Sequence, residues 1–178
     1  MDSLKDCLSQ YNKLPAVIGK FSLEGTDILN DGALQIYYKS ENNKNGYFTI
    51  TIYNSGIYVS DELDNPLILN EYLNCKNVFK IMEDRGYYQN VRVLIEEPYR
   101  VSKNTEPEFL NMVLMYFHRL ENGDYVAELS SFYLRSNFGY FHKIRFSDVS
   151  DEPEKNISDM KYFIKTWNEF VKNMDLRD

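Results

Sequence analysis

The chain has 178 residues, a length that favours one domain, residues 1–178, built around a single core. Hydrophobic residues make up 43% of it and charged residues 26%, which is the balance of a folded protein and not of a disordered one. The 27 Asp and Glu outnumber the 20 Lys and Arg, and the net charge of -7 repels nucleic-acid phosphates and anionic membranes. We therefore expect no nucleic acid and no membrane as a partner, and a basic protein suits this charge better.

The N-terminus and the cysteines predict a cytoplasmic protein. The first six residues carry two acids and lead into no apolar segment, so we expect no secretory signal. Cys7 and Cys75 lie far apart and match no metal-binding or CxxC spacing, so we expect reduced thiols.

The N-terminal half is expected to form a helix and then three strands. Apolar residues recur at i, i+3, i+4 and i+7 between Ser3 and Pro15, which predicts a short N-terminal helix. The turn-forming residues of segment 24–32 predict a loop. Segments Leu34–Tyr38 and Tyr47–Tyr53 then alternate around a polar turn, which predicts a hairpin, and Ile57–Val59 is expected to add a brief third strand.

The middle of the chain predicts one helix and one strand. The Asp64-Asn65-Pro66 sequence is typical of a helix start, and Gly86 is expected to end that helix as a C-cap. Val91, Val93 and Ile95 alternate with Arg92, Leu94 and Glu96, which predicts a strand that stops at Pro98.

Segment Thr105–Leu120 fits two interpretations. Thr105 and Glu108 form a capping-box pattern before apolar residues at near-helical spacing, which predicts a helix. Asn122-Gly123 stands between two apolar runs, however, and this is the strongest short-range hairpin signal. We favour the hairpin, and a second turn at Ser136–Gly139 extends it into a meander.

The C-terminus predicts a long amphipathic helix capped by Ser158. Its apolar residues keep a nearly unbroken helical spacing: Met160, Phe163, Ile164, Trp167, Phe170, Val171 and Met174. The fold class expected from all elements is α+β, an antiparallel sheet of about six to seven strands with hairpins and a C-terminal meander, packed with N-terminal, middle and C-terminal helices.

The meander register predicts which residues share a face. With two-residue loops at Asn122-Gly123 and Asn137-Phe138, one face of the meander is a core face for the C-terminal helix. Its members are Met112, Leu114, Tyr116, Leu129, Tyr133, Ile144 and Phe146. The opposite face mixes apolar residues with charges, and either another helix covers it or it binds a partner. The candidate partner-binding residues on this second face are Met115, Phe117, Phe132, Phe141, Lys143 and Arg145.

A search for catalytic or metal-binding patterns gives no candidate. The two histidines, His118 and His142, are expected on one face but roughly 20 Å apart along the strands, too far for a joint site. No nucleophile elbow or Gly-rich phosphate loop occurs, and the acidic segments 61–64 and 148–154 lack the spacing of a calcium loop. We therefore predict no catalytic residue, no metal and no cofactor.

Two functions are expected from these observations. The first is a non-enzymatic interaction protein that binds and inhibits or escorts a basic protein, such as an immunity-type or phage counter-defence inhibitor. It would be steered by charge and would bury Phe117, Phe132 and Phe141. The alternative is a protein that binds a small apolar ligand in an aromatic-lined cavity between the sheet and the C-terminal helix. A homodimer is compatible with both functions.

Overall fold

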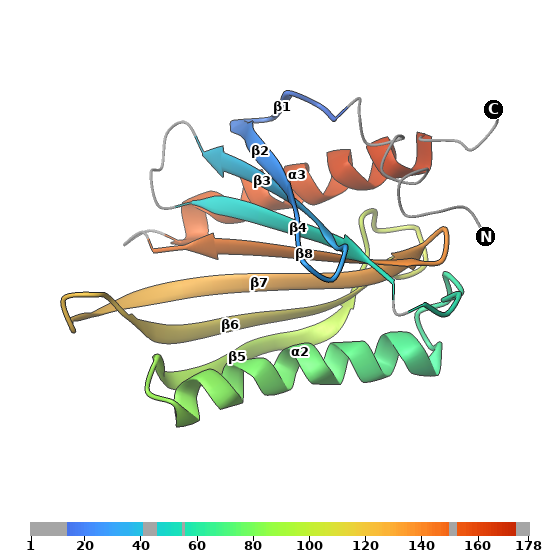
Figure 1. The fold of residues 1–178 in the computed structure, drawn as a ribbon. Coiled ribbons are helices and arrows are strands. Elements are labelled where there is room, and N and C mark those ends of the chain that lie inside the picture. Colours follow the sequence, from blue (N-terminus) through green and yellow to red (C-terminus); the bar gives the residue numbers. More distant parts are fainter. Residues whose placement is uncertain (1–13, 41–45, 55, 150–152, 174–178) are drawn as a thin grey trace.

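The structure is a computed structural model that describes residues 14–40, 46–54, 56–149 and 153–173. Within these ranges the chain forms eight strands and two helices (Figure 1). In chain order they are β1 (Val17–Ile18), β2 (Phe21–Ile28), β3 (Leu34–Ser40), β4 (Tyr47–Tyr53), α2 (Pro66–Asp84), β5 (Tyr88–Tyr99), β6 (Phe109–Arg119), β7 (Tyr125–Asn137), β8 (Tyr140–Asp148) and α3 (Pro153–Asn173). The α+β class with an antiparallel sheet is thus confirmed, but the sheet has eight strands where six to seven were expected, because β1 and β2 were not predicted.

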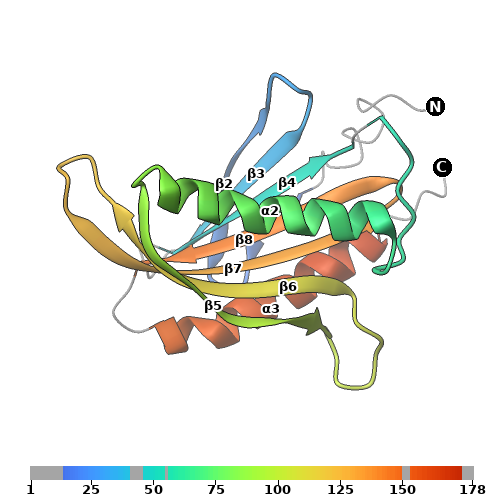
Figure 2. The same cartoon turned by 90° about the horizontal axis from the view of Figure 1, so that it is seen from below.

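The strands form one antiparallel sheet with the order β1-β2-β3-β4-β8-β7-β6-β5. The N-terminal strands and the C-terminal meander meet where β4 pairs with β8, for example Thr51 with Lys143. Figures 1 and 2 show α2 and α3 on opposite faces of this sheet. The sheet is therefore the middle layer of three.

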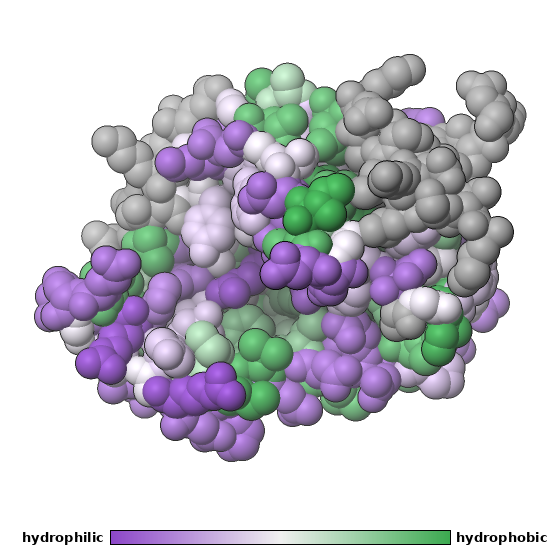
Figure 3. Space-filling model, in the orientation of Figure 1, coloured by the Kyte–Doolittle hydropathy of each residue, from purple (hydrophilic) through white to green (hydrophobic). Residues whose placement is uncertain are grey.

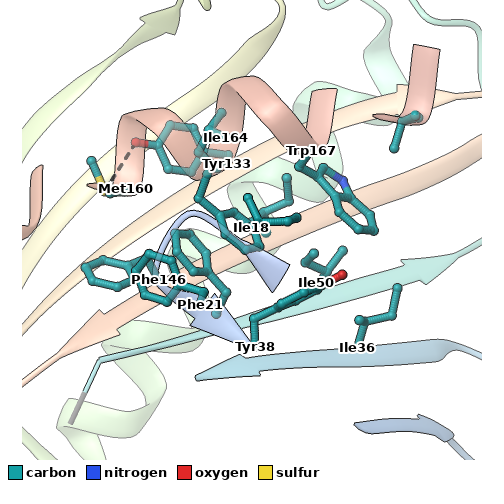
Figure 4. Packing of buried hydrophobic residues seen from close by; sticks show 14 of the residues in the cluster. Ile18, Phe21, Ile36, Tyr38, Ile50, Tyr133, Phe146, Met160, Ile164 and Trp167 are labelled. Carbon is teal, nitrogen blue, oxygen red and sulfur yellow. Dashed lines mark hydrogen bonds between the residues drawn. The ribbon is translucent and has the colours of Figure 1, made fainter. Parts of the chain in front are cut away.

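The face under α3 holds a core rich in aromatic rings. Phe163 of α3 stacks on Phe48 of β4 with ring centroids 3.7 Å apart, and Phe21 meets both rings edge-on. Trp167 lies over Tyr38, and Tyr133 donates a hydrogen bond to Met160 Sδ (3.5 Å; Figure 4). The predicted C-terminal helix is confirmed, and its inward stripe is confirmed from Met160 to Val171, whereas Met174 lies outside the described residues.

The face under α2 holds a second core over β5 to β8. Asn65 caps α2 by accepting a hydrogen bond from the Leu67 amide (2.8 Å), and Pro66 fits the first helical position. Tyr72 of α2 donates a hydrogen bond to the Asn111 carbonyl (3.0 Å), and Phe79 packs against Tyr116. The predicted middle helix is confirmed, and it covers only the meander half of the sheet.

Several element predictions differ from the structure in detail. Segment Phe21–Ile28 is a strand where a loop was expected, and a bulge between Leu23 and Gly25 leaves Glu24 as the extra residue in its pairing with β3. The strand expected at Ile57–Val59 is absent there, since the Val59 carbonyl instead accepts a hydrogen bond from Ser136 Oγ (2.9 Å). Helix α3 begins at Pro153, before the cap predicted at Ser158. The expected N-terminal helix lies outside the described residues.

The predicted meander faces are wrong because one loop is longer than expected. Leu120 donates its amide to the Asp124 carbonyl (2.7 Å), so the first loop has three residues and Tyr116 pairs with Glu128. A shift of one residue turns a strand's other face to its neighbour. Met112, Leu114 and Tyr116 consequently lie under α2, whereas Tyr133, Ile144 and Phe146 lie under α3.

The second meander turn also differs, without changing the faces. Phe138 (φ 55°) and Gly139 (φ 81°) both have positive φ, the backbone of a type I′ turn, so Asn137 pairs with Tyr140. The register between β7 and β8 is therefore two residues from the expected one. Because side chains alternate between the two faces with a period of two, a shift of two residues keeps the same side chains of β7 and β8 together on one face.

Candidate functional site

The candidate site is a groove between α2 and the strands β3, β4 and β8, with a volume of about 390 Å³. It is visible as the hollow in the middle of Figure 3. The groove exists because α2 covers the meander, while α3 lies on the other side of β3 and β4. Alternation along β4 sends Phe48, Ile50 and Ile52 into the α3 core and leaves the other face to polar residues.

The groove has a polar floor and apolar walls. Gln35, Thr49 and Thr51 line it from β3 and β4. Val78 and Phe79 of α2 line it from the helix, together with Leu29, Ala33 and Phe132. Hydroxyl and amide groups therefore face apolar surface across one cavity, as in most small-molecule sites.

On the α2 wall, Glu71 accepts hydrogen bonds from two neighbouring side chains. The Tyr53 hydroxyl donates to Glu71 Oε1, and the Cys75 thiol approaches the same oxygen (3.5 Å). Burial raises the pKa of Tyr53, and Glu71 raises it further. Burial also raises the pKa of Cys75 to about 12, so this free cysteine is a thiol at neutral pH and not an activated nucleophile.

On the floor, Arg145 is part of a buried network. Its Nη2 lies 3.2 Å from Glu128 Oε1 and also donates to the Tyr116 hydroxyl, which itself donates to Glu128 (2.6 Å). Its Nε donates to Ser130 Oγ (3.0 Å). Glu128 is 3% exposed, so its carboxylate compensates the charge of Arg145 inside the fold.

Lys143 differs from Arg145, although both line the groove from β8. Its Nζ lies 5.1 Å from the centre of the Tyr53 ring. No carboxylate among the described residues forms an ion pair with it within 4.0 Å. The side chain is half-buried and lines the groove, where its ammonium group lies near the ring of Tyr53 and acts electrostatically on the Cys75 thiol.

The six residues predicted to form one partner-binding surface do not lie together. Lys143, Arg145 and the edge of Phe132 line the groove, while Phe132 and Phe141 are otherwise buried under α2 with exposed fractions of 3% and 4%. Met115 and Phe117 belong to the other face of β6 and are 37% and 40% exposed. The one-residue shift of β6 separates them, and it leaves both phenylalanines under α2 inaccessible to a partner.

The two histidines lie on opposite faces, contrary to the expectation that they share one. Nδ1 of His118 lies 3.2 Å from Glu128 Oε2 on the α2 side. His142 is 1% exposed and lies on the same face of β8 as Ile144, and burial together with Arg135 lowers its pKa to about 3. Among the described residues, no three His, Cys, Asp or Glu side chains are grouped to hold a metal ion.

The groove itself was missed by the reasoning from sequence. Of its polar residues, only Lys143 and Arg145 were candidates, whereas Gln35, Tyr53 and Glu71 were not. The available signal was the pair Thr49 and Thr51, which place hydroxyls on one face of an otherwise apolar strand.

Comparison with known proteins does not assign this chain to a family. No protein-family model and no curated protein matches this chain. The solution structure of cyanobacterial PsbP (CyanoP) from Synechocystis sp. PCC 6803 is similar over 83% of this chain and 91% of that chain, with 12% identity and a TM-score of 0.44. A likeness this distant carries no argument about function. None of the described helices is long and apolar enough to cross a membrane.

Proposed function

We propose that the protein is a non-enzymatic binding protein whose groove between α2 and the sheet binds a small amphipathic anion. The observation that carries this proposal is the Lys143 ammonium group, which faces an apolar-walled cavity without a carboxylate partner among the described residues. The proposal keeps the cytoplasmic location expected from the reduced cysteines, and Cys75 is free.

The size and lining of the groove support a small ligand. A volume of about 390 Å³ falls within the usual range of ligand pockets. The apolar side chains of Val78 and Phe79 suit the body of such a ligand. Thr51 pairs with Lys143 across β4 and β8 and lines the same groove, so it supplies a hydroxyl on the face from which the ammonium group would bind the anionic end.

This proposal moves the ligand from the place expected from sequence. The alternative function put an apolar ligand between the sheet and the C-terminal helix, where Phe163, Trp167 and Tyr38 are now seen to pack ring against ring. The groove lies on the opposite face, and its polar floor favours an amphipathic ligand over a purely apolar one.

Binding of 3-phenylpropionate, followed by isothermal titration calorimetry, tests the proposal. We expect 3-phenylpropionate to bind and the neutral 3-phenylpropanol to bind about tenfold more weakly, because one charge-assisted hydrogen bond is lost. Lys143→Met should weaken binding of 3-phenylpropionate by a similar factor. The matched control is Lys165→Met, since that lysine is exposed on α3, far from the groove lining. Equal affinity in the two variants would contradict the proposal.

A second candidate function is the capture of a basic protein, as expected from the net charge of -7. The observation that favours it is the exposure of Met115 and Phe117 on β6. Affinity capture from the native lysate at low and high salt would recover a stoichiometric basic protein, and Phe117→Asp would lose it. Recovery of the tagged protein alone would reject this function and leave the groove proposal in place.

A further inference from the structure

The groove holds a second charge that the anion proposal does not use. Glu71 lines it from α2, opposite Lys143 on β8. Both of its hydrogen-bonded neighbours, Tyr53 and Cys75, are neutral donors, because burial keeps their pKa values high. No cation among the described residues forms an ion pair with Glu71 within 4.0 Å. Its negative charge is therefore without a counter-charge in this part of the fold.

The two unpaired charges line the same groove and have Tyr53 as a common neighbour. Tyr53 stands between them: its hydroxyl donates to Glu71, and its ring lies 5.1 Å from Lys143 Nζ. Both charges act electrostatically on the Cys75 thiol: in addition to the larger increase caused by burial, Lys143 lowers the pKa of the thiol and Glu71 raises it. The carboxylate and the ammonium group are thus near neighbours along one aromatic ring, yet they form no ion pair with each other within 4.0 Å.

The other two charged residues that line the groove are Arg145 and Asp31, and neither is both buried and without a counter-charge. Arg145 is compensated by Glu128, and Asp31 is exposed in the loop after β2, where it accepts the Ala33 amide (3.0 Å). Partly buried charges are costly when they lack a counter-charge. A ligand that carries a cation and an anion side by side would satisfy Glu71 and Lys143 together.

We propose that the groove is a zwitterion site, which binds an α-amino acid with an apolar side chain. The ligand carboxylate meets Lys143 and the Thr51 hydroxyl, and the ligand ammonium group meets Glu71. The side chain of the amino acid lies against Val78 and Phe79. Charge-assisted hydrogen bonds of about 2.8 Å at both ends would let a compact head group bridge two charges that form no ion pair with each other within 4.0 Å. This inference rests on the proposed function of the groove and adds the ammonium subsite to it.

The test compares three probes of one shape by isothermal titration calorimetry: L-phenylalanine, 3-phenylpropionate, which lacks the ammonium group, and phenethylamine, which lacks the carboxylate. We expect L-phenylalanine to bind about tenfold or more tightly than either of the others, because each lacks one charge-assisted contact. Glu71→Gln should remove this advantage of L-phenylalanine over 3-phenylpropionate. Glu169→Gln, on the exposed side of α3, is the matched control and should change nothing.

The outcomes separate this inference from the proposed function. Glutamine at position 71 still accepts the Tyr53 hydrogen bond, and unchanged binding of 3-phenylpropionate to that variant shows that the groove is intact. If the wild-type protein binds L-phenylalanine no more tightly than 3-phenylpropionate, or if Glu71→Gln leaves L-phenylalanine binding unchanged, the zwitterion site is refuted while anion binding stands. If Lys143→Met leaves all three affinities unchanged, the proposed function fails as well.

Discussion

The two faces of the sheet are built from the same strands but have opposite characters. On the α3 face, Phe48 and Ile50 of β4 are fully buried under aromatic rings. On the α2 face, Thr49 and Thr51 of the same strand form the floor of an open groove. One helix lies over the centre of the sheet, and the other covers only its meander half. The comparison shows that the placement of a helix can leave an open groove on one face of a sheet whose other face is closed.

The largest effect is expected in the closed core. Phe163→Ala should lower the free energy of unfolding by about 3–5 kcal/mol, because it removes a ring that is 0% exposed and contacts Phe21, Tyr38 and Phe48. Urea denaturation measures this change. Phe79→Ala is the comparison on the α2 face, where the side chain borders the groove, and it should cost less. Equal losses would mean that the two faces do not differ in packing.

A smaller loss is expected from the network beneath the groove. Glu128→Ala should lower the free energy of unfolding by about 2–3 kcal/mol, since it leaves Arg145 and the Tyr116 hydroxyl without their shared acceptor. The partial exposure of Arg145 keeps the loss below that of a fully buried pair. Glu128→Gln retains an acceptor and should cost less in the same denaturation experiment. If the free energy of unfolding of the Glu128→Ala variant equals that of the wild-type protein, the network does not stabilise the groove floor.

The smallest of these effects is expected at the turn between β7 and β8. Gly139→Ala should cost about 1–2 kcal/mol, because φ is +81° and a Cβ would lie 2.7 Å from Tyr58 Cδ2. Removing the ring in Tyr58→Ala should relieve the contact in the double variant but not the backbone strain. Thermal denaturation of the two single variants and the double variant separates the two contributions, and full recovery in the double variant would contradict any role for φ.

The parts of the fold that sequence reasoning predicted are those set by local patterns. The hairpin of β3 and β4 follows from alternation around a polar turn, and α3 follows from its apolar stripe. Strand β2 was missed because Gly25 and its neighbours resemble a turn when their pairing with β3 is unknown. Local preference is overridden there by tertiary pairing.

The site was harder to predict than the fold because it depends on long-range packing. The Asn122-Gly123 pair correctly indicated a hairpin, but whether its loop has two or three residues decides which side chains of β6 lie under α2. Lys143 and Arg145 were correctly placed on one face of β8, yet Glu71 and Tyr53 join them only through the position of α2 over the sheet. No spacing in the chain encodes that position.

The pairing of β4 with β8 has a consequence for how the protein folds. The hairpin of β3 and β4 and the meander of β6 to β8 consist of neighbours in sequence, whereas the β4–β8 seam joins segments far apart and must close a long loop. Thr51 and Lys143 stand on the two sides of that seam. The groove is therefore completed only when contacts distant in sequence form, and a ligand that binds there would stabilise the pairing of the two halves of the chain.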